Sequence, residues 1–263
     1  MRAALVILLA GAACSKSATP APTPSPSPSP SPSPSPIPET STQLVTTVTD
    51  DWTATTGVMR VWHRTRPATA WTPDGDGWPV VVGKTGTAWG RGLHGDAAPV
   101  ASSGTGPLKR EGDGKAPAGA FALRGAYGYA DAAPEGTALP YAPLTADTEC
   151  VDDPASRHYT RILERATTDA DWTSSEHMRR TDKLYTWVID VAHNPDATRG
   201  SGSCIFLHVW RDASAPTVGC TAMTEPNMRT LLHMLTPAAA PVYVLLPRAE
   251  YGALQKVWGL PQL

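Results

Sequence analysis

A proline-serine tract at residues 20–38, in which nearly every second residue is proline, constrains this chain most. Proline fixes the backbone φ angle and has no N–H donor, so the tract can form neither a helix nor a sheet. It is typical of an extended polyproline-type spacer, which rises about 3 Å per residue and would reach about 60 Å. A disordered linker without a length requirement is the alternative. Folding is therefore expected in residues 44–263, enough for one sizeable core.

The residues before the tract have the pattern of an export signal. Met1 and Arg2 precede an apolar run over residues 3–13. This run is too short for a membrane-spanning helix, which takes roughly 20 residues. It matches the apolar region of a secretory signal. We expect residues 1–13 to be a signal peptide and the chain to be exported to the cell envelope or periplasm.

Cys14 follows small residues and resembles the lipidated cysteine of bacterial lipoproteins. Such proteins usually carry leucine three residues before the cysteine, where this chain has Gly11. The resemblance implies a lipid anchor at Cys14, attachment to a membrane, and a linker over residues 14–43. An ordinary signal peptide with an incidental Cys14 is the alternative.

Charge and cysteine content limit the function further. The formal charge of −2 provides no basic footprint for nucleic acid, so we expect no nucleic-acid partner. Setting aside a lipidated Cys14 leaves Cys150, Cys204 and Cys220. In an exported protein one pair can oxidise, which leaves one free thiol. The cysteine pattern alone does not identify the free one.

Apolar stretches bounded by glycine and proline predict a mainly-β fold. They cover residues 57–64, 78–83, 119–123, 184–191, 204–210 and 241–246. Thr224 can cap a helix that Pro237 ends, and a second helix is predicted over residues 174–180. Strands do not alternate regularly with helices, so a sandwich or a barrel-like fold with a few short helices is expected.

One segment has the residue types of a nucleophilic site. His208 lies near the end of an apolar stretch, and Gly219-Cys220 follows twelve residues after it, just before the predicted helix. A cysteine at a helix N-terminus has a lowered thiol pKa. Gly219 allows a tight turn whose N–H groups could hold an oxyanion, and an imidazole could move the protons.

Two other interpretations of these residues stay open at this point. A buried cysteine is usually an inert small apolar residue, and a histidine on an apolar strand usually belongs to the core. Zinc binding by Cys204, His208 and Cys220 is also possible, although closely spaced ligand pairs are missing.

The segment resembles the catalytic motif of the L,D-transpeptidase family, the YkuD-type domain of bacterial peptidoglycan enzymes. That motif is a histidine, a variable stretch, and then Ser/Thr-His-Gly-Cys. Its counterparts here are His208, Thr217, Gly219 and Cys220. Residues 109–121 look like another family stretch, and the likeness extends over about residues 80–247.

The resemblance implies an L,D-transpeptidase-like β-sandwich and a function. Cys220 would form an acyl-enzyme with a peptidoglycan stem peptide, and His208 would transfer protons. Backbone groups around Gly219 and Thr217 would hold the oxyanion. The acyl group would pass to an amine acceptor and form a 3→3 cross-link, with neither metal nor organic cofactor. Arg211 and Trp210 are weaker candidates for substrate binding.

Two departures from the motif favour alternatives. Val218 stands where the family often has histidine, and Thr221-Ala222-Met223 replaces the usual Arg or Asn after the cysteine. A branch ending in Gly-Cys-x-Ala-Met includes hydrolases that release a lipoprotein from peptidoglycan. An L,D-carboxypeptidase or amidase is therefore one alternative, and a non-catalytic wall-binding lipoprotein is another.

The resemblance also bears on the cysteines. Since it implies that Cys220 stays a thiol, Cys150 and Cys204 are left to form a disulfide. Closing that loop would contribute roughly 3 to 5 kcal/mol in the chain-entropy model. Two buried free thiols are the alternative.

Overall fold

The computed structural model describes residues 35–66, 69–96, 98–99, 101–104 and 106–263. The expected signal peptide over residues 1–13 and the expected lipidation site Cys14 lie outside the described residues. Within the described part of the chain, no helix has both the length and the apolar character needed to cross a membrane.

The prediction of a mainly-β fold with a few short helices is confirmed. The strands of the large sheet are β1 (Gln43–Thr49), β2 (Thr56–His63), β3 (Thr72–Pro73), β4 (Trp78–Val81), β5 (Thr87–Trp89), β6 (Ala116–Gly128), β7 (Tyr141–Pro143), β11 (Trp187–Val191), β12 (Phe206–Val209), β13 (Thr221–Met223) and β14 (Val242–Pro247). A small sheet contains β8 (Thr148–Val151), β9 (Ile162–Glu164) and β10 (Ser175–His177). The helices are α1 (Glu225–Met234) and α2 (Arg248–Trp258), with short 3-10 turns at Arg165–Thr167 and Pro237–Ala239.

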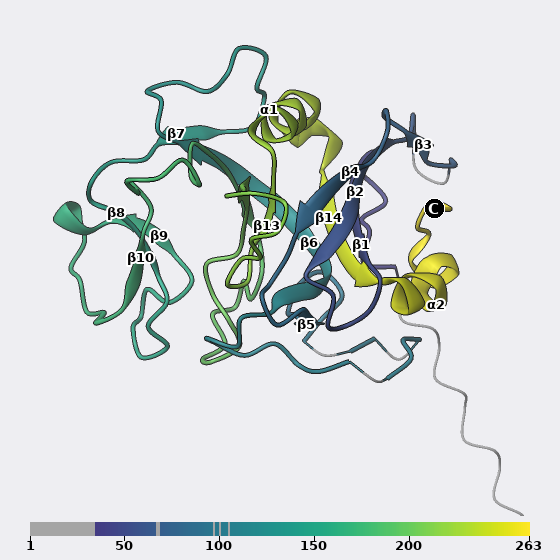
Figure 1. Cartoon of the computed structure of the whole chain (residues 1–263), viewed down its shortest axis with the longest axis horizontal. Coiled ribbons are helices and arrows are strands. Elements are labelled where there is room, and N and C mark those ends of the chain that lie inside the picture. Colours follow the sequence, from purple (N-terminus) through teal and green to yellow (C-terminus); the bar gives the residue numbers. More distant parts are fainter. Residues whose placement is uncertain (1–34, 67–68, 97, 100, 105) are drawn as a thin grey trace, which may run out of the picture. The chain divides into compact units, whose positions relative to one another are not determined.

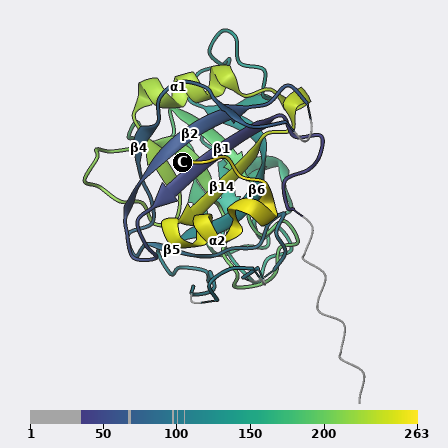
Figure 2. The same ribbon diagram turned by 90° about the vertical axis from the view of Figure 1, so that its right-hand side faces the viewer.

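The large sheet closes on itself. Strand β1 pairs in parallel with β14 on one side and antiparallel with β2 on the other. The order β14-β6-β11-β12-β13-β4-β2 therefore returns to β1 and forms a barrel-like ring (Figures 1 and 2). Six of the seven residues of β1 are buried, because side chains on both of its faces are covered.

The two helices cover opposite sides of this ring (Figure 2). Helix α1 packs against β11 and β12, and α2 packs against β14 and β1. Thr224 caps α1 as expected, since its side chain accepts a hydrogen bond from the Asn227 N–H at 3.2 Å. The face of α1 that carries Met228, Leu231 and Leu232 is buried. The apolar stripe thus fixes α1 over the strand that carries His208.

The helix predicted over residues 174–180 is wrong. Ser175–His177 is strand β10, which pairs antiparallel with β8 and places Glu176 opposite Cys150. A short segment gains too few internal hydrogen bonds to hold a helix by itself, so pairing with β8 decides its conformation. The small sheet lies at the side of the ring away from α2 (Figure 1).

Candidate active site

Strand pairing brings His208 and Cys220 to one place. His208 lies on β12, and Cys220 immediately precedes β13. These strands pair in parallel with Leu207 opposite Thr221, so Cys220 lies beside Phe206. The Phe206 N–H donates to the Cys220 Sγ at 3.3 Å.

Both side chains line a cavity of about 310 Å³, called here the histidine-side cavity. Trp210 and Arg211, the two weaker candidates, also line it. The structure therefore brings together four of the residues that the sequence singles out.

The environment of His208 defines its protonation. Its Nδ1 lies 2.7 Å from the Val209 carbonyl oxygen. A carbonyl can only accept, so Nδ1 carries the proton and Nε2 keeps the lone pair. Burial lowers the pKa of His208 to about 4, and the edge of the Tyr185 ring packs against it with centroids 5.2 Å apart. His208 is therefore neutral at pH 7 and can accept a proton.

The Cys220 thiol is held in its protonated form. Burial raises its pKa well above the usual range, and the negative charge of Glu176 raises it further. The Phe206 N–H acts in the opposite direction. Attack by Cys220 therefore requires transfer of its proton as substrate binds, rather than a resting thiolate.

The expected lowering of the thiol pKa by a helix N-terminus is wrong. Strand β13 separates Cys220 from α1, which begins only at Glu225. The field of a helix terminus falls off within about one turn, so it cannot offset the burial of the sulfur.

Thr217 fixes the turn before the cysteine. Its hydroxyl donates to the Cys220 carbonyl oxygen at 2.6 Å and accepts from the Gly219 N–H at 3.1 Å. The Thr217 backbone is bonded to Val82 and Lys84 at the end of β4. Among the residues described, the Cys220 N–H has no acceptor. An oxyanion could therefore use the Cys220 N–H directly, whereas Gly219 and Thr217 hold the shape of the turn.

A second cavity of about 300 Å³ reaches the same sulfur from another direction. Lys109, Glu111 and Ser203 line it, so we call it the lysine-side cavity. The residues common to both cavities are Glu176, Val218 and Cys220. The thiol thus lies where two separate hollows meet.

Sequence reasoning missed Glu176 and Tyr185 as site residues. The Tyr185 hydroxyl donates to Glu176 Oε1 at 2.5 Å. Nothing in their spacing from Cys220 indicates this contact, because it depends on the pairing of β10 with β8.

A disulfide joins Cys150 on β8 to Cys204, just before β12. This is the pairing expected from the family resemblance, and Cys220 is the free thiol of the described part of the chain. The Cys204 carbonyl oxygen lies 3.6 Å from the Cys220 Sγ. Since the Cys204 sulfur is bonded to carbon and sulfur only, it cannot serve as the zinc ligand considered above. No group of three or more metal-ligating side chains occurs among the described residues.

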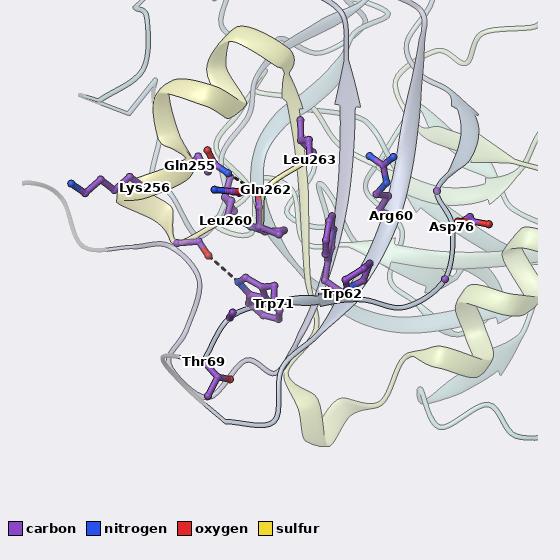
Figure 3. Close-up of a pocket in the computed structure, with 16 residues that line it drawn as sticks. Arg60, Trp62, Thr69, Trp71, Asp76, Gln255, Lys256, Leu260, Gln262 and Leu263 are labelled. Carbon is purple, nitrogen blue, oxygen red and sulfur yellow. Dashed lines mark hydrogen bonds between the residues drawn. The ribbon is translucent and has the colours of Figure 1, made fainter.

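A larger cavity lies elsewhere in the described part of the chain and is lined by neither cysteine nor histidine. It measures about 980 Å³ and is lined by Arg60, Trp62, Trp71 and other residues near α2 (Figure 3). The Trp71 Nε1 donates to the Gly259 carbonyl oxygen at 2.9 Å, and the Arg64 guanidinium stacks on its ring. Neither cysteine nor histidine lines this cavity, so its size does not make it the reactive site.

A free cysteine just before β13 and a neutral histidine on the adjacent strand β12 line one cavity of a β-rich barrel, an arrangement that suits cysteine-dependent chemistry. The model of the L,D-transpeptidase catalytic domain, YkuD, matches residues 59–244. The chain therefore belongs to the L,D-transpeptidase family, whose cysteine-dependent enzymes act on peptidoglycan. Comparison with curated proteins gives no match, and comparison with solved structures gives none either.

We expect His208 to set the acid limb of the pH profile. Below a pH of about 4 its Nε2 becomes protonated, so the rate of Cys220 acylation should fall about tenfold per pH unit. In the unfolded chain the pKa of this histidine is near 6.5. The unfolded state therefore binds a proton that the folded state lacks between pH 6.5 and about 4. The free energy of unfolding should fall as the pH drops through that window and level off below it.

Acylation rates and urea denaturation between pH 3 and 8 would check both effects. In His208→Gln, the free energy of unfolding should fall less steeply between pH 6.5 and about 4 than in the wild-type chain. An unchanged curve in that variant would contradict the assignment.

Proposed function

We propose that this protein is an L,D-transpeptidase that forms an acyl-enzyme on Cys220 and transfers the acyl group to an amine. The observation that supports this most is the junction of two cavities at one thiol. Two hollows at one sulfur would let the acyl group stay in one cavity while an acceptor amine approaches from the other. A single hollow would suffice for hydrolysis.

In the first half-reaction, His208 Nε2 takes the Cys220 proton as the sulfur attacks a carbonyl carbon of the donor stem peptide. That carbonyl belongs to the L-centre of a diamino acid linked to D-alanine. The oxyanion is held by the Cys220 N–H. The C–N bond then breaks, and the imidazolium gives its proton to the leaving D-alanine amine. A thioester and free D-alanine result.

In the second half-reaction, a neutral side-chain amine of another stem peptide attacks the thioester carbon. His208 takes the proton that the amine loses and returns it to the sulfur as the C–S bond breaks. The product is a 3→3 cross-link, and the enzyme regains its thiol. His208 passes each proton between the Cys220 sulfur and a substrate amine, so these proton transfers involve no metal or organic cofactor.

Hydrolysis of the same thioester is the second candidate, and Val218 favours it. This side chain is 70% exposed and belongs to the wall common to both cavities. It offers no polar group to orient an incoming amine, whereas water needs little orientation. The protein would then be an L,D-carboxypeptidase, or an amidase that frees a wall-bound protein.

Product analysis tests the proposal. The purified chain would be incubated with disaccharide-tetrapeptide, and the products would be separated and weighed by mass spectrometry. Cross-linked dimer with released D-alanine, absent from Cys220→Ala, is the expected result. Formation of tripeptide without dimer would show that the protein hydrolyses the acyl-enzyme and does not transfer the acyl group to an amine. A folded protein that releases no D-alanine from any stem peptide would overturn both.

We also propose that the chain is exported and anchored in the cell envelope through Cys14. The support is the apolar run over residues 3–13 and the small residues before the cysteine. Fractionation of expressing bacteria should place the protein with membranes, and Cys14→Ser should release it. A cytoplasmic protein with an intact N-terminus would contradict export.

A further inference from the structure

Glu176 occupies the wall between the two cavities, and its charge opposes catalysis in the substrate-free protein. Its side chain lines both cavities beside Cys220 and is 24% exposed. A carboxylate next to a thiol disfavours the thiolate, and Glu176 raises the pKa of Cys220 for this reason. Because Glu176 makes the thiolate less favourable, its carboxylate is expected to have another role at this position.

The groups around Glu176 compensate its negative charge only in part. Tyr185 donates a hydrogen bond to Oε1 but carries no charge. The nearest cation is Arg180, whose Nη1 lies 3.8 Å from Oε1. The same guanidinium donates to Asp182 through Nε and Nη2 at 3.0 and 2.9 Å, so one cation is shared between two carboxylates and lies closer to Asp182. Asp152 adds a further negative charge nearby.

The pKa of Glu176 is raised, which agrees with this partial compensation. Burial raises it, while Tyr185 and Arg180 lower it less than burial raises it. A cation arriving in either cavity would therefore interact with this carboxylate more strongly than with one already paired. The charge of Lys109 lowers the pKa of Cys220, but its Nζ pairs with Asp113 at 2.5 Å, and no ion pair joins it to Glu176 among the described residues.

We propose that Glu176 binds the ammonium group at the far end of the donor's diamino-acid side chain, and that this binding activates Cys220. The inference rests on the proposed function, since it names what that site recognises. A diamino-acid side chain ends in an ammonium group, and a diamino acid with a second carboxyl group carries a carboxylate on the same carbon. Arg211, on the wall of the histidine-side cavity, provides a positive charge for the carboxylate.

Activation follows from charge compensation. An ammonium on Glu176 cancels the negative charge that disfavours the thiolate, so the pKa of Cys220 falls when the correct donor binds. A donor whose amine is already acylated, as in an existing cross-link, lacks the ammonium and leaves the thiol protonated. The site would thus select stem peptides with a free side-chain amine.

The first measurement is the rate of Cys220 alkylation by iodoacetamide in the substrate-free chain, as a function of pH. Glu176→Gln removes the charge and keeps the size, so alkylation near pH 8 should become about 10-fold faster. Glu164→Gln makes the same change on β9, away from the cavities that contain Cys220, and should leave the rate unchanged. Equal rates in all three proteins would overturn the proposal.

The second measurement compares two tetrapeptide donors, one with a free side-chain amine and one with that amine acetylated. The wild-type chain should acylate from the free-amine donor about 10- to 100-fold faster in kcat/KM. Glu176→Gln should process both donors at similar rates, and Glu164→Gln should keep the preference.

The outcomes separate this inference from the proposed function. If Glu176→Gln slows both donors equally and keeps the preference, Glu176 only supports the fold, while the acyl-enzyme on Cys220 stands. If neither donor acylates the wild-type chain, the proposed function fails. The alkylation rates then still decide whether Glu176 controls the thiol.

Discussion

Replacing Cys220 by alanine is expected to abolish acyl-enzyme formation, with a loss of more than about 10⁴-fold in rate. The thiol lies within one cavity with His208 and is the free thiol of the described part of the chain. The Thr217 and Tyr185 hydroxyls at this cavity are poor replacements, because Thr217 donates to the Cys220 carbonyl oxygen and Tyr185 donates to Glu176. The chemistry should therefore disappear rather than move to another residue.

Intact-mass spectrometry after incubation with a carbapenem measures this effect. The wild-type chain should gain the mass of one drug molecule, and Cys220→Ala should gain none. The substitution removes one sulfur atom and its hydrogen bonds with the Phe206 N–H and the Cys204 carbonyl oxygen, so the variant should still fold. Cys220→Ser serves as a control that preserves size. An adduct that persists in the alanine variant would contradict the assignment of the nucleophile.

The Cys150→Ser/Cys204→Ser double variant should lose about 4 kcal/mol in the free energy of unfolding. The bond spans 54 residues of sequence, and its removal frees the unfolded chain to explore more conformations. The same variant should also lose activity. Cys204 holds the backbone beside the Cys220 sulfur, and Cys150 lies opposite Glu176 in the small sheet.

Urea denaturation without reductant measures the stability of this variant, and D-alanine release measures its activity. Wild-type chain treated with dithiothreitol provides a control in which the sequence is unchanged. Equal denaturation midpoints for oxidised and reduced protein would show that the disulfide stabilises nothing. Full activity in the double variant would show that the disulfide is not needed to hold the residues of the site in position.

The elements with strong local signals were predicted from the sequence. All six predicted apolar stretches contain strands, and α1 begins after Thr224 as its cap and the Glu225-Pro226 pair indicate. The ends of the predicted strands were less accurate. Residues 119–123 are only the middle of β6, since pairing with β5 extends it toward Ala116 and pairing with β11 extends it toward Gly128.

Elements whose conformation depends on distant partners were missed. Strand β1 has threonines among its valines and gives only a weak apolar pattern, yet β14 and β2 pair with it from both sides. Helix α2 was not predicted, although Gly259 ends it in the left-handed region with φ of 64°. The apolar face of α2 becomes decisive only when β14 and β1 lie beneath it.

The sequence by itself determined the mainly-β class of fold and the family to which the chain belongs. Those depend on apolar periodicity and on motifs carried by neighbouring residues. The assignment of Cys220 as nucleophile with His208 stays a prediction. Only the tertiary structure decided the charge around the thiol. Glu176 reaches Cys220 through the pairing of β10 with β8 and the disulfide to Cys204, and Tyr185 reaches the site through ring contacts with Phe206 and His208. Electrostatic interaction depends on distance in space and on burial, and neither can be read from separation along the chain.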